Sequence, residues 1–290
     1  MAIDVHFLTE SALDDPRLAD YRDLRERRIG KSGSVSGPSS PGEASGRFIA
    51  ESETVVRKLL AAGLPVCSLL VTAPRLAALE PTLLVTTPPP PVYVVPQSVM
   101  DQIAGFHVHR GCLAVAARPR QSRLPHDARL VVVLVDLVDV DNLGTMARNA
   151  AAFGADALLL SPRCADPFYR KAVRTSVGAV LSLPIVRAAR WPDDLVALRE
   201  QHGFRLVGTV VGQPAQPLAD FVPPPRLAIL FGSEGPGLDP STQGLCDALV
   251  TVPMAANHGV DSLNVSAAGA VFLYHCTQKA LAARPAARAL

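Results

Sequence analysis

The sequence predicts an α/β protein of two domains, a small N-terminal α/β domain and a larger C-terminal domain built on a mostly parallel sheet. The chain has 290 residues, of which 49% are hydrophobic, so it is longer than an average domain and has enough apolar residues for two cores. The near-continuous run RLVVVLVDLVDV, which begins at Arg129, is typical of a strand buried on both faces of a parallel sheet. Strand and helix patterns then alternate, which indicates a doubly wound fold.

Changes in composition set the predicted boundaries. The N-terminal domain is expected over 1–117, and a polar, basic, Pro-containing linker is expected over 118–128. The C-terminal domain then covers 129–290. Within the first domain, the Gly/Ser/Pro tract at 30–46 has no apolar periodicity, so we expect a mobile loop there.

The N-terminal domain begins with a run of mixed charges in which Leu18, Tyr21 and Leu24 stand at helical spacing. This pattern favours a helix with one solvated face. The elements that follow are a helix that ends at Gly63, a strand in VCSLLVT, a strand and then a helix in VYVVPQSVMDQIAG, and a strand in CLAVAARP.

The C-terminal domain follows its first strand with a regular alternation of patterns. Helices are predicted in GTMARNAAAF, FYRKAVRTSVGAV and PDDLVALREQHG and from about Ser262 onward, and strands in ALLLS, LPIV, RLVGTVV, RLAILFG and ALVTVP. Ligands of such folds bind at the carboxyl ends of the strands, so the loops that follow the strands are where function is expected.

Charge and cysteine content exclude several classes of protein. The formal net charge is only +2, so the whole molecule does not indicate a polyanion partner, although local basic clusters can still serve one. The five cysteines are far apart with no C-x-x-C pair, which argues against a zinc knuckle and a disulfide framework. The N-terminus lacks a signal-peptide pattern, and the richest apolar run is interrupted by Asp136, so we expect a soluble cytoplasmic protein.

The first of three notable loops, VDVDNLGTMARN, places Asn142, Gly144, Arg148 and Asn149 at a strand-to-helix turn and in the first helical turns. The plain interpretation makes Asn142 an N-cap and Arg148 a surface cation. One glycine falls short of the G-x-G-x-x-G pattern, so dinucleotide binding is not supported.

The second loop, FGSEGPGLDP, carries Gly232, Gly235 and Gly237 around Glu234. Glycines allow close approach of a backbone to a ligand, whereas Glu234 would repel the phosphates of a nucleotide, so a neutral or cationic ligand fits better. The alternative is a plain tight turn in which Asp239 caps the next helix.

The third loop ends in GVDSLNVS, where Ser262 and Asn264 can each cap the following helix. Only one cap is needed, so the additional polar groups suggest a ligand. The pair His107 and His109, even with His258 in this loop, lacks the ligand set of a metal site, and no metal is expected.

Together the three loops resemble, in residue types, order and spacing, the signature motifs of the SpoU/TrmH branch of the SPOUT superfamily. NLGTMARNAAAFGA resembles the first motif, LFGSEGPGL the second and VPMAANHGVDSLNVSAAGAVFLY the third, over Arg129 to His275. PFYRKAVRTSVGAV resembles the ribosomal-RNA-modifying members, including the thiostrepton-resistance methyltransferase group. The N-terminal part is similar to that group's ribosomal-protein-like substrate-binding domain.

The resemblance implies an S-adenosylmethionine-dependent methyltransferase that acts on a ribose 2′-hydroxyl of RNA, expected to be ribosomal RNA. It further implies a deep trefoil knot formed by the last strand and helix, which general rules of topology would not predict. A homodimer is implied, in which the first-motif arginine of one subunit completes the site of the other. The alternatives are a transfer RNA 2′-O-methyltransferase, an enzyme that methylates a base nitrogen, and a non-catalytic RNA-binding or ribosome-assembly protein.

The resemblance also implies roles for individual residues. Arg148 matches the cation near the reacting hydroxyl, and Arg174 matches a basic position that contacts RNA or the partner's ligand. The matched polar residues around the reacting centre are Asn142, Glu234, Ser262 and Asn264. The matched cofactor contacts are Gly232, Val252, Met254 and Leu263. Thr209 matches a further cofactor contact less directly, because its loop varies in length among relatives.

Overall fold

A computed structural model of the whole chain describes residues 3–24, 46–120, 122–212, 214–255, 259 and 261–282. The loop predicted over 30–46 lies outside these residues except for Gly46, and so does His258. No helix within the described ranges is both long enough and apolar enough to cross a membrane. The chain forms two compact units, Met1–Arg120 with Asp166–Ser182, and Gln121–Ala165 with Leu183–Leu290.

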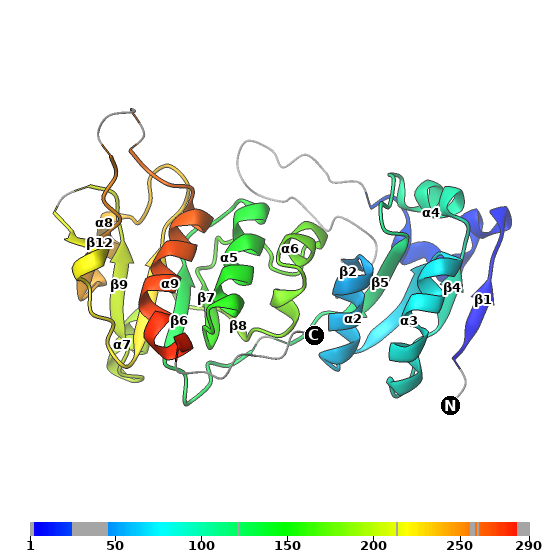
Figure 1. Cartoon of the computed structure of the whole chain (residues 1–290), viewed down its shortest axis with the longest axis horizontal. Helices are drawn as coiled ribbons and strands as arrows, with labels where there is room; N and C mark the ends of the chain where they lie inside the picture. The colour runs from blue at the N-terminus through cyan, green and yellow to red at the C-terminus, as the bar shows by residue number, and fades with distance from the viewer. Residues whose placement is uncertain are drawn as a thin grey trace. The chain divides into compact units, whose positions relative to one another are not determined.

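The first unit contains a mixed sheet with the strand order β1-β4-β3-β5-β2. The strands β1, β4 and β3 are parallel, whereas β5 pairs antiparallel with both β3 and β2. The strands are β1 (Val5–Phe7), β2 (Arg47–Glu51), β3 (Val66–Val71), β4 (Val92–Val94) and β5 (Cys112–Ala117), and the helices between them are α2 (Glu53–Ala61), α3 (Ala73–Val85) and α4 (Gln97–Ala104) (Figure 1). The α/β character predicted for this part is confirmed.

The charged segment near the N-terminus differs from its prediction. Its described part forms the short 3₁₀ segments η1 (Glu10–Asp14) and η2 (Pro16–Tyr21). Leu18 and Tyr21 are fully buried, and the Tyr21 hydroxyl lies 2.8 Å from Ser68 Oγ. The apolar spacing therefore identified the buried side chains, while Pro16 and its Asp15 cap start a tight turn.

The helix predicted in FYRKAVRTSVGAV is present as α6 (Arg170–Thr175), followed by the short η3 (Ala179–Leu181). Although this segment connects two strands of the second unit, it packs within the first unit, where α6 contacts β2. Arg170 is buried there, forms an ion pair with Glu51, donates to the Leu24 carbonyl and stacks over Phe106. At this segment the compact units and the predicted domain boundaries do not coincide.

The second unit contains a parallel sheet with the order β10-β12-β9-β11-β6-β7-β8, which confirms the mostly parallel layout. The strands are β6 (Leu130–Leu134), β7 (Ala157–Leu160), β8 (Ile185–Arg187), β9 (Arg205–Thr209), β10 (Gln216–Pro217), β11 (Leu227–Phe231) and β12 (Ala248–Thr251). The helical segments are α5 (Val140–Ala152), α7 (Asp193–Glu200), η4 (Leu218–Asp220), α8 (Pro240–Leu245) and α9 (Val265–Ala282).

Both faces of this sheet are covered, as the long apolar run predicted. Val131 and Val133 of β6 share one core with Leu195 and Leu198 of α7. Over the opposite face α5 and α9 lie side by side (Figure 1).

The two helices α5 and α9 approach each other closely at a glycine. A Cβ at Gly269 would lie 2.3 Å from Met146 Sδ. One turn further along α9, Phe272 packs edge-on against Phe231 of the sheet, with ring centroids 5.8 Å apart. The start of α9 is thereby fixed beside the start of α5 and the end of β11.

All five cysteines are free and buried or partly buried. Burial raises the pKa of Cys112 to about 12, that of Cys246 to about 11 and that of Cys276 to about 12. These three thiols are therefore poorly reactive.

Candidate active site

The three loops singled out in the sequence follow the parallel strands β6, β11 and β12 of the second unit, and their polar residues meet at the carboxyl ends of those strands. Each loop leads into a helix, α5, α8 or α9. In an open parallel sheet this edge is where ligands bind.

The loop after β11 is shaped by its glycines. A Cβ at Gly232 would lie 2.1 Å from the Gly237 carbonyl carbon and 2.3 Å from Leu238 N, so only glycine fits there. The loop folds back at Gly235 and Gly237, whose φ angles are +97° and +69°, and the N–H of Gly237 donates to the Ser233 carbonyl. Asp239 also caps α8 by accepting from the Thr242 N–H. The tight turn predicted as the alternative is therefore present in the same loop as the glycines that would approach a ligand.

A chain of hydrogen bonds joins the three loops. Asn142 Nδ2 donates to Glu234 Oε1 at 2.5 Å, and Asn264 Nδ2 donates to Asn142 Oδ1 at 3.0 Å. Asn264 Oδ1 in turn accepts from the N–H and the hydroxyl of Ser266, at 2.9 Å and 2.6 Å.

The structure corrects the predicted cap of α5 and decides between the two predicted caps of α9. The cap of α5 is Asp139, which accepts from the Asn142 N–H at 2.8 Å, so the Asn142 side chain is left to join Glu234 to Asn264. Of the two candidate caps of α9, Asn264 rather than Ser262 accepts from its first turn, through the N–H and the hydroxyl of Ser266.

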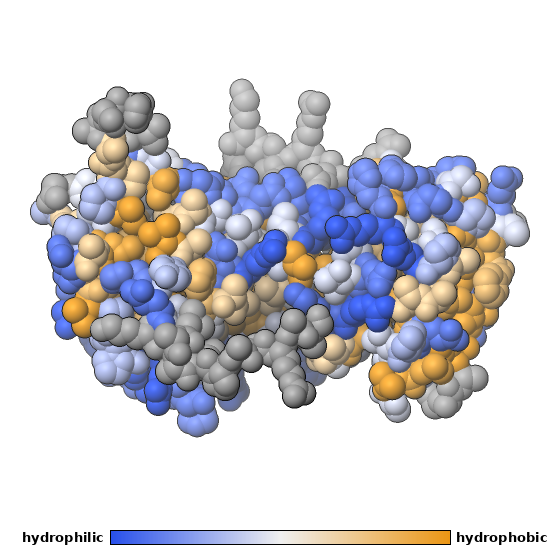
Figure 2. Space-filling view, in the orientation of Figure 1, coloured by the Kyte–Doolittle hydropathy of each residue, from blue (hydrophilic) through white to orange (hydrophobic). Residues whose placement is uncertain are grey.

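A pocket lies beside this network, and its walls are mostly apolar. All of the predicted cofactor contacts line it, namely Thr209, Gly232, Val252, Met254 and Leu263. The hydropathy-coloured surface shows hydrophobic residues gathered beside the first turns of α9 (Figure 2). The Thr209 hydroxyl donates to the Leu230 carbonyl, so this side chain contributes mainly its methyl group.

Ser262 also lines the pocket, and its hydroxyl donates to Asp261 Oδ1 at 3.0 Å. Asp261, which directly precedes Ser262 in the third motif, lines the pocket as well and was not predicted as a site residue. Its carboxylate gives an otherwise apolar pocket an acidic rim, which suits a ligand with a positive charge.

The two predicted arginines lie in different environments. Arg148 is exposed on α5, and it has no hydrogen bond or ion pair with any residue that the structure describes. Its neighbour Asn149 instead turns toward α9 and donates to the Ser266 carbonyl at 2.7 Å. Arg174 belongs to the first unit, where its Nη1 lies 3.5 Å from Glu51 Oε2.

A further polar group follows β6 and was not selected from the sequence as a site residue. Asp136 has a positive φ of +54°, accepts from the Ser161 hydroxyl and pairs with Arg163. Burial alone would raise the pKa of Asp136, but the hydrogen bonds from Arg163 and Ser161 lower it overall. The backbone before α5 is therefore held in a conformation that non-glycine residues seldom adopt.

His107 and His109 lie in the first unit, and His107 pairs with Asp101. Across the described ranges, no three His, Cys, Asp or Glu side chains are grouped so that they would hold a metal ion.

Comparison with known proteins gives consistent results. The sequence profile of the SpoU rRNA Methylase family matches residues 129–274. A protein of Mycobacterium tuberculosis, described as an uncharacterized tRNA/rRNA methyltransferase, is 39% identical over 274 residues, which cover 91% of this chain and 90% of that protein.

Two solved structures are similar over nearly the whole chain. An AdoMet-bound rRNA methyltransferase from Sinorhizobium meliloti superposes with a TM-score of 0.75 at 24% identity and covers 96% of this chain and 98% of its own. An RNA 2′-O ribose methyltransferase superposes with a TM-score of 0.73 at 25% identity and covers 95% of this chain and 100% of its own.

Proposed function

This chain belongs to the SpoU rRNA methylase family of RNA methyltransferases, and from that premise we propose that it methylates a ribose 2′-hydroxyl in RNA, with ribosomal RNA as the expected substrate. Its cofactor is S-adenosylmethionine, and it works in the cytoplasm with its RNA. The observation that carries the proposal is the apolar pocket at the carboxyl edge of the parallel sheet, next to the Asn142–Glu234–Asn264 network.

The pocket residues fit this cofactor. S-adenosylmethionine has an apolar and aromatic part, a polar adenine edge and a sulfonium cation. The side chains of Val252, Met254 and Leu263 offer apolar contact, the missing Cβ at Gly232 leaves backbone accessible, and Asp261 supplies negative charge at the rim. A phosphate-bearing ligand would fit poorly beside two carboxylates, Asp261 and Glu234.

When bound, S-adenosylmethionine supplies an activated methyl group. The protein must then hold a ribose hydroxyl in line, remove its proton and stabilise the negative charge that develops on its oxygen. Arg148 is the residue proposed for the last task, because a guanidinium stays charged and is therefore a poor base but a strong charge partner. It binds the adjacent phosphate or lowers the pKa of the hydroxyl, and water takes the proton.

The polar network has a positioning task. Asn142 joins the start of α5 to the Glu234 loop, and Asn264 joins both to the start of α9. Ser262, which is exposed at the pocket rim, is proposed to contact RNA. Arg174 is proposed to contact an RNA phosphate, and its exposed fraction of 40% is compatible with that role.

A homodimer with a trefoil knot in each C-terminal domain is part of the proposal. A residue that completes the site of a second subunit must be exposed and not engaged within its own subunit. Arg148 is exposed and has no partner among the described residues. On α9, Val271 and Tyr274 remain 42% and 58% exposed, so this helix offers apolar surface to a second copy.

The experiment that tests the proposal incubates the purified protein with labelled S-adenosylmethionine and unmodified ribosomal RNA, with transfer RNA in a parallel reaction. We expect label in ribosomal RNA, and a loss of at least about 100-fold in rate for Arg148→Ala. Arg205→Ala is the matched control, because Arg205 is exposed at the amino end of β9, away from the pocket edge of the sheet.

The reactions also separate the alternatives. The mycobacterial relative is described as a tRNA/rRNA methyltransferase, so label in transfer RNA alone would identify that substrate class instead. If a folded protein labels neither RNA, the enzyme proposal is wrong and a non-catalytic RNA-binding role replaces it.

A further inference from the structure

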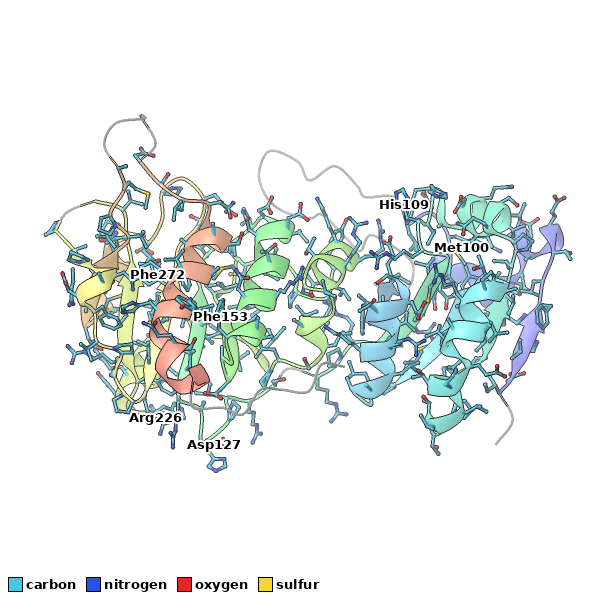
Figure 3. The ribbon with its side chains drawn as sticks, viewed as in Figure 1. Met100, His109, Asp127, Phe153, Arg226 and Phe272 are labelled. Atoms are coloured by element: carbon cyan, nitrogen blue, oxygen red, sulfur yellow. The ribbon has the colours of Figure 1, made fainter. Side chains whose placement is uncertain are left out.

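The H-x-H motif, for which no metal site is expected, lies in a loop of the first unit that connects α4 to β5. Residues 105–111 form this loop, and His107, His109 and Arg110 are exposed on it. The rings of His107 and His109 meet edge to face, with centroids 4.8 Å apart. Arg110 has no hydrogen bond or ion pair within the described part of the chain. His109 lies at the end of the unit beside α4 (Figure 3).

The loop is rigidly supported although its tip is exposed. Asp101 accepts from the Val108 N–H at 2.9 Å and from Gln97 Nε2 at 2.6 Å, and it pairs with His107 Nδ1 at 2.7 Å. Burial would raise the pKa of Asp101, but the hydrogen bonds from His107, Val108 and Gln97 lower it overall. Val108 itself is fully buried. The His107 ring and the loop backbone next to it are therefore held in place, which reduces the entropy lost when a ligand binds.

An open apolar groove lies beside Gln97, one of the residues that hold this loop in place. It has a volume of about 610 Å³ at the carboxyl ends of the parallel strands β1, β3 and β4, and Phe7, Pro74 and Pro96 line it. Phe7 is 72% exposed. Thr72 and Gln97 line the groove too, and a Cβ at Gly111 would lie 2.9 Å and 3.0 Å from their side-chain oxygens. The loop of residues 105–111, called the histidine loop below, and the groove thus share one wall.

We propose that this groove and the histidine loop together bind unpaired nucleotides of the RNA substrate. The inference rests on the proposed function, which requires RNA. The groove accepts a base against the exposed Phe7 ring, and the loop offers a second base the His109 ring and a phosphate the Arg110 guanidinium. The Asp101 carboxylate, which supports the loop, is engaged by the Val108 N–H, by Gln97 Nε2 and by His107 Nδ1.

An unpaired nucleotide fits better than a duplex. Bases within an A-form helix are stacked and their faces are closed, so an apolar groove and exposed rings gain little from them. Single-stranded RNA offers both a base face and a phosphate at each step.

The test measures the binding of the full-length protein, without cofactor, to a fluorescein-labelled 12-nucleotide oligouridylate and to a 12-base-pair RNA duplex. We expect Phe7→Ala and His109→Ala to weaken oligouridylate binding by about 5- to 100-fold, as loss of base stacking does, and to change duplex binding little. Arg110→Ala should lower the slope of log affinity against log salt by about 0.7, whereas Phe7→Ala should leave that slope unchanged.

Matched controls separate this site from general surface effects. His126 is 99% exposed in the second unit, and Val85 is 80% exposed on α3, so His126→Ala and Val85→Ala should bind as the wild type does. His109→Phe retains a ring and should restore binding if stacking is the cause. Thermal unfolding confirms that each variant is folded.

Three outcomes would overturn the proposal: wild-type protein that does not prefer the single strand, variants that bind it as tightly as the wild type, or controls that lose binding equally. Because no methyl transfer is measured, these outcomes do not depend on the proposed activity. With an RNA that is methylated, the Phe7 and His109 variants should raise KM and leave kcat unchanged. An active enzyme with an unchanged KM in both variants would reject this site alone.

Discussion

Gly232→Ala tests how tightly the loop after β11 controls the pocket. A Cβ at this position would lie 2.1 Å, 2.3 Å and 2.5 Å from three backbone atoms of Gly237 and Leu238. Ordinary contact begins near 3.4 Å, and backbone atoms cannot turn aside as the end of a side chain does. The Gly237 peptide must therefore retreat by roughly 1 Å to reach ordinary contact, and Gly232, Ser233 and Gly237 all line the pocket.

We expect two measurable effects of this displacement. Overpacking of this kind costs about 1–3 kcal/mol of unfolding free energy, which corresponds to a Tm lower by about 2–4 °C for each kcal/mol. The affinity for S-adenosylmethionine, measured by isothermal titration calorimetry, should fall by at least about tenfold, because the backbone that faces the ligand has moved.

Gly244→Ala is the control for this variant. Gly244 lies in α8, its added Cβ would meet no atom within 4 Å, and alanine favours a helix by about 0.5–1 kcal/mol. It should keep cofactor affinity and should not lower Tm. If Gly232→Ala binds the cofactor as tightly as the wild type does, the assignment of this pocket to S-adenosylmethionine is wrong.

Other positions give further expectations. Glu51→Ala removes the carboxylate that forms the buried ion pair with Arg170 and should cost about 3–5 kcal/mol in urea unfolding. Glu53→Ala removes partly exposed pairs and should cost less than about 1 kcal/mol; equal losses would contradict the importance of the buried pair. Asn142→Ala should retain cofactor affinity but lower the methyl-transfer rate, since it separates Glu234 from Asn264; an unchanged rate would remove the network from the mechanism. Hydrogen bonds from Ser241 and Thr242 lower the pKa of Asp239 to about 2, so its stabilising effect is complete above an unfolded pKa of about 3.9 and is lost as pH falls toward 2. The stability difference between wild type and Asp239→Asn should therefore shrink from pH 5 to pH 2.5, and a constant difference would contradict this.

The site in the second unit was largely predictable because its residues are close to strand ends. In a parallel sheet every carboxyl end lies at one edge, so the loops that carry Asn142, Glu234 and Asn264 had to converge once the strands were identified. The glycine-rich loop was recognised from its composition, and the collision at Gly232 supplies the physical reason.

Other features depend on contacts that the local sequence does not contain. The partners of Arg170 in the first unit are Glu51, Leu24 and Phe106, and hydrophobic periodicity within α6 gives no sign of which unit this helix joins. Asp139 rather than Asn142 caps α5, because several polar residues at a turn compete for the same N–H groups and only the backbone geometry decides among them. The strand β10 has two residues and is too short to show a period.

The central claim is that this chain methylates the 2′-hydroxyl of a ribose, and the most direct measurement is the position of the methyl group in the product. RNA methylated by the purified enzyme is partly hydrolysed in alkali and its fragments are resolved to single nucleotides. The account predicts one bond that resists cleavage after treatment with wild-type enzyme and that is cleaved after treatment with Arg148→Ala. A methylated RNA in which alkali cleaves every bond would contradict it, because the methyl group would then be on a base.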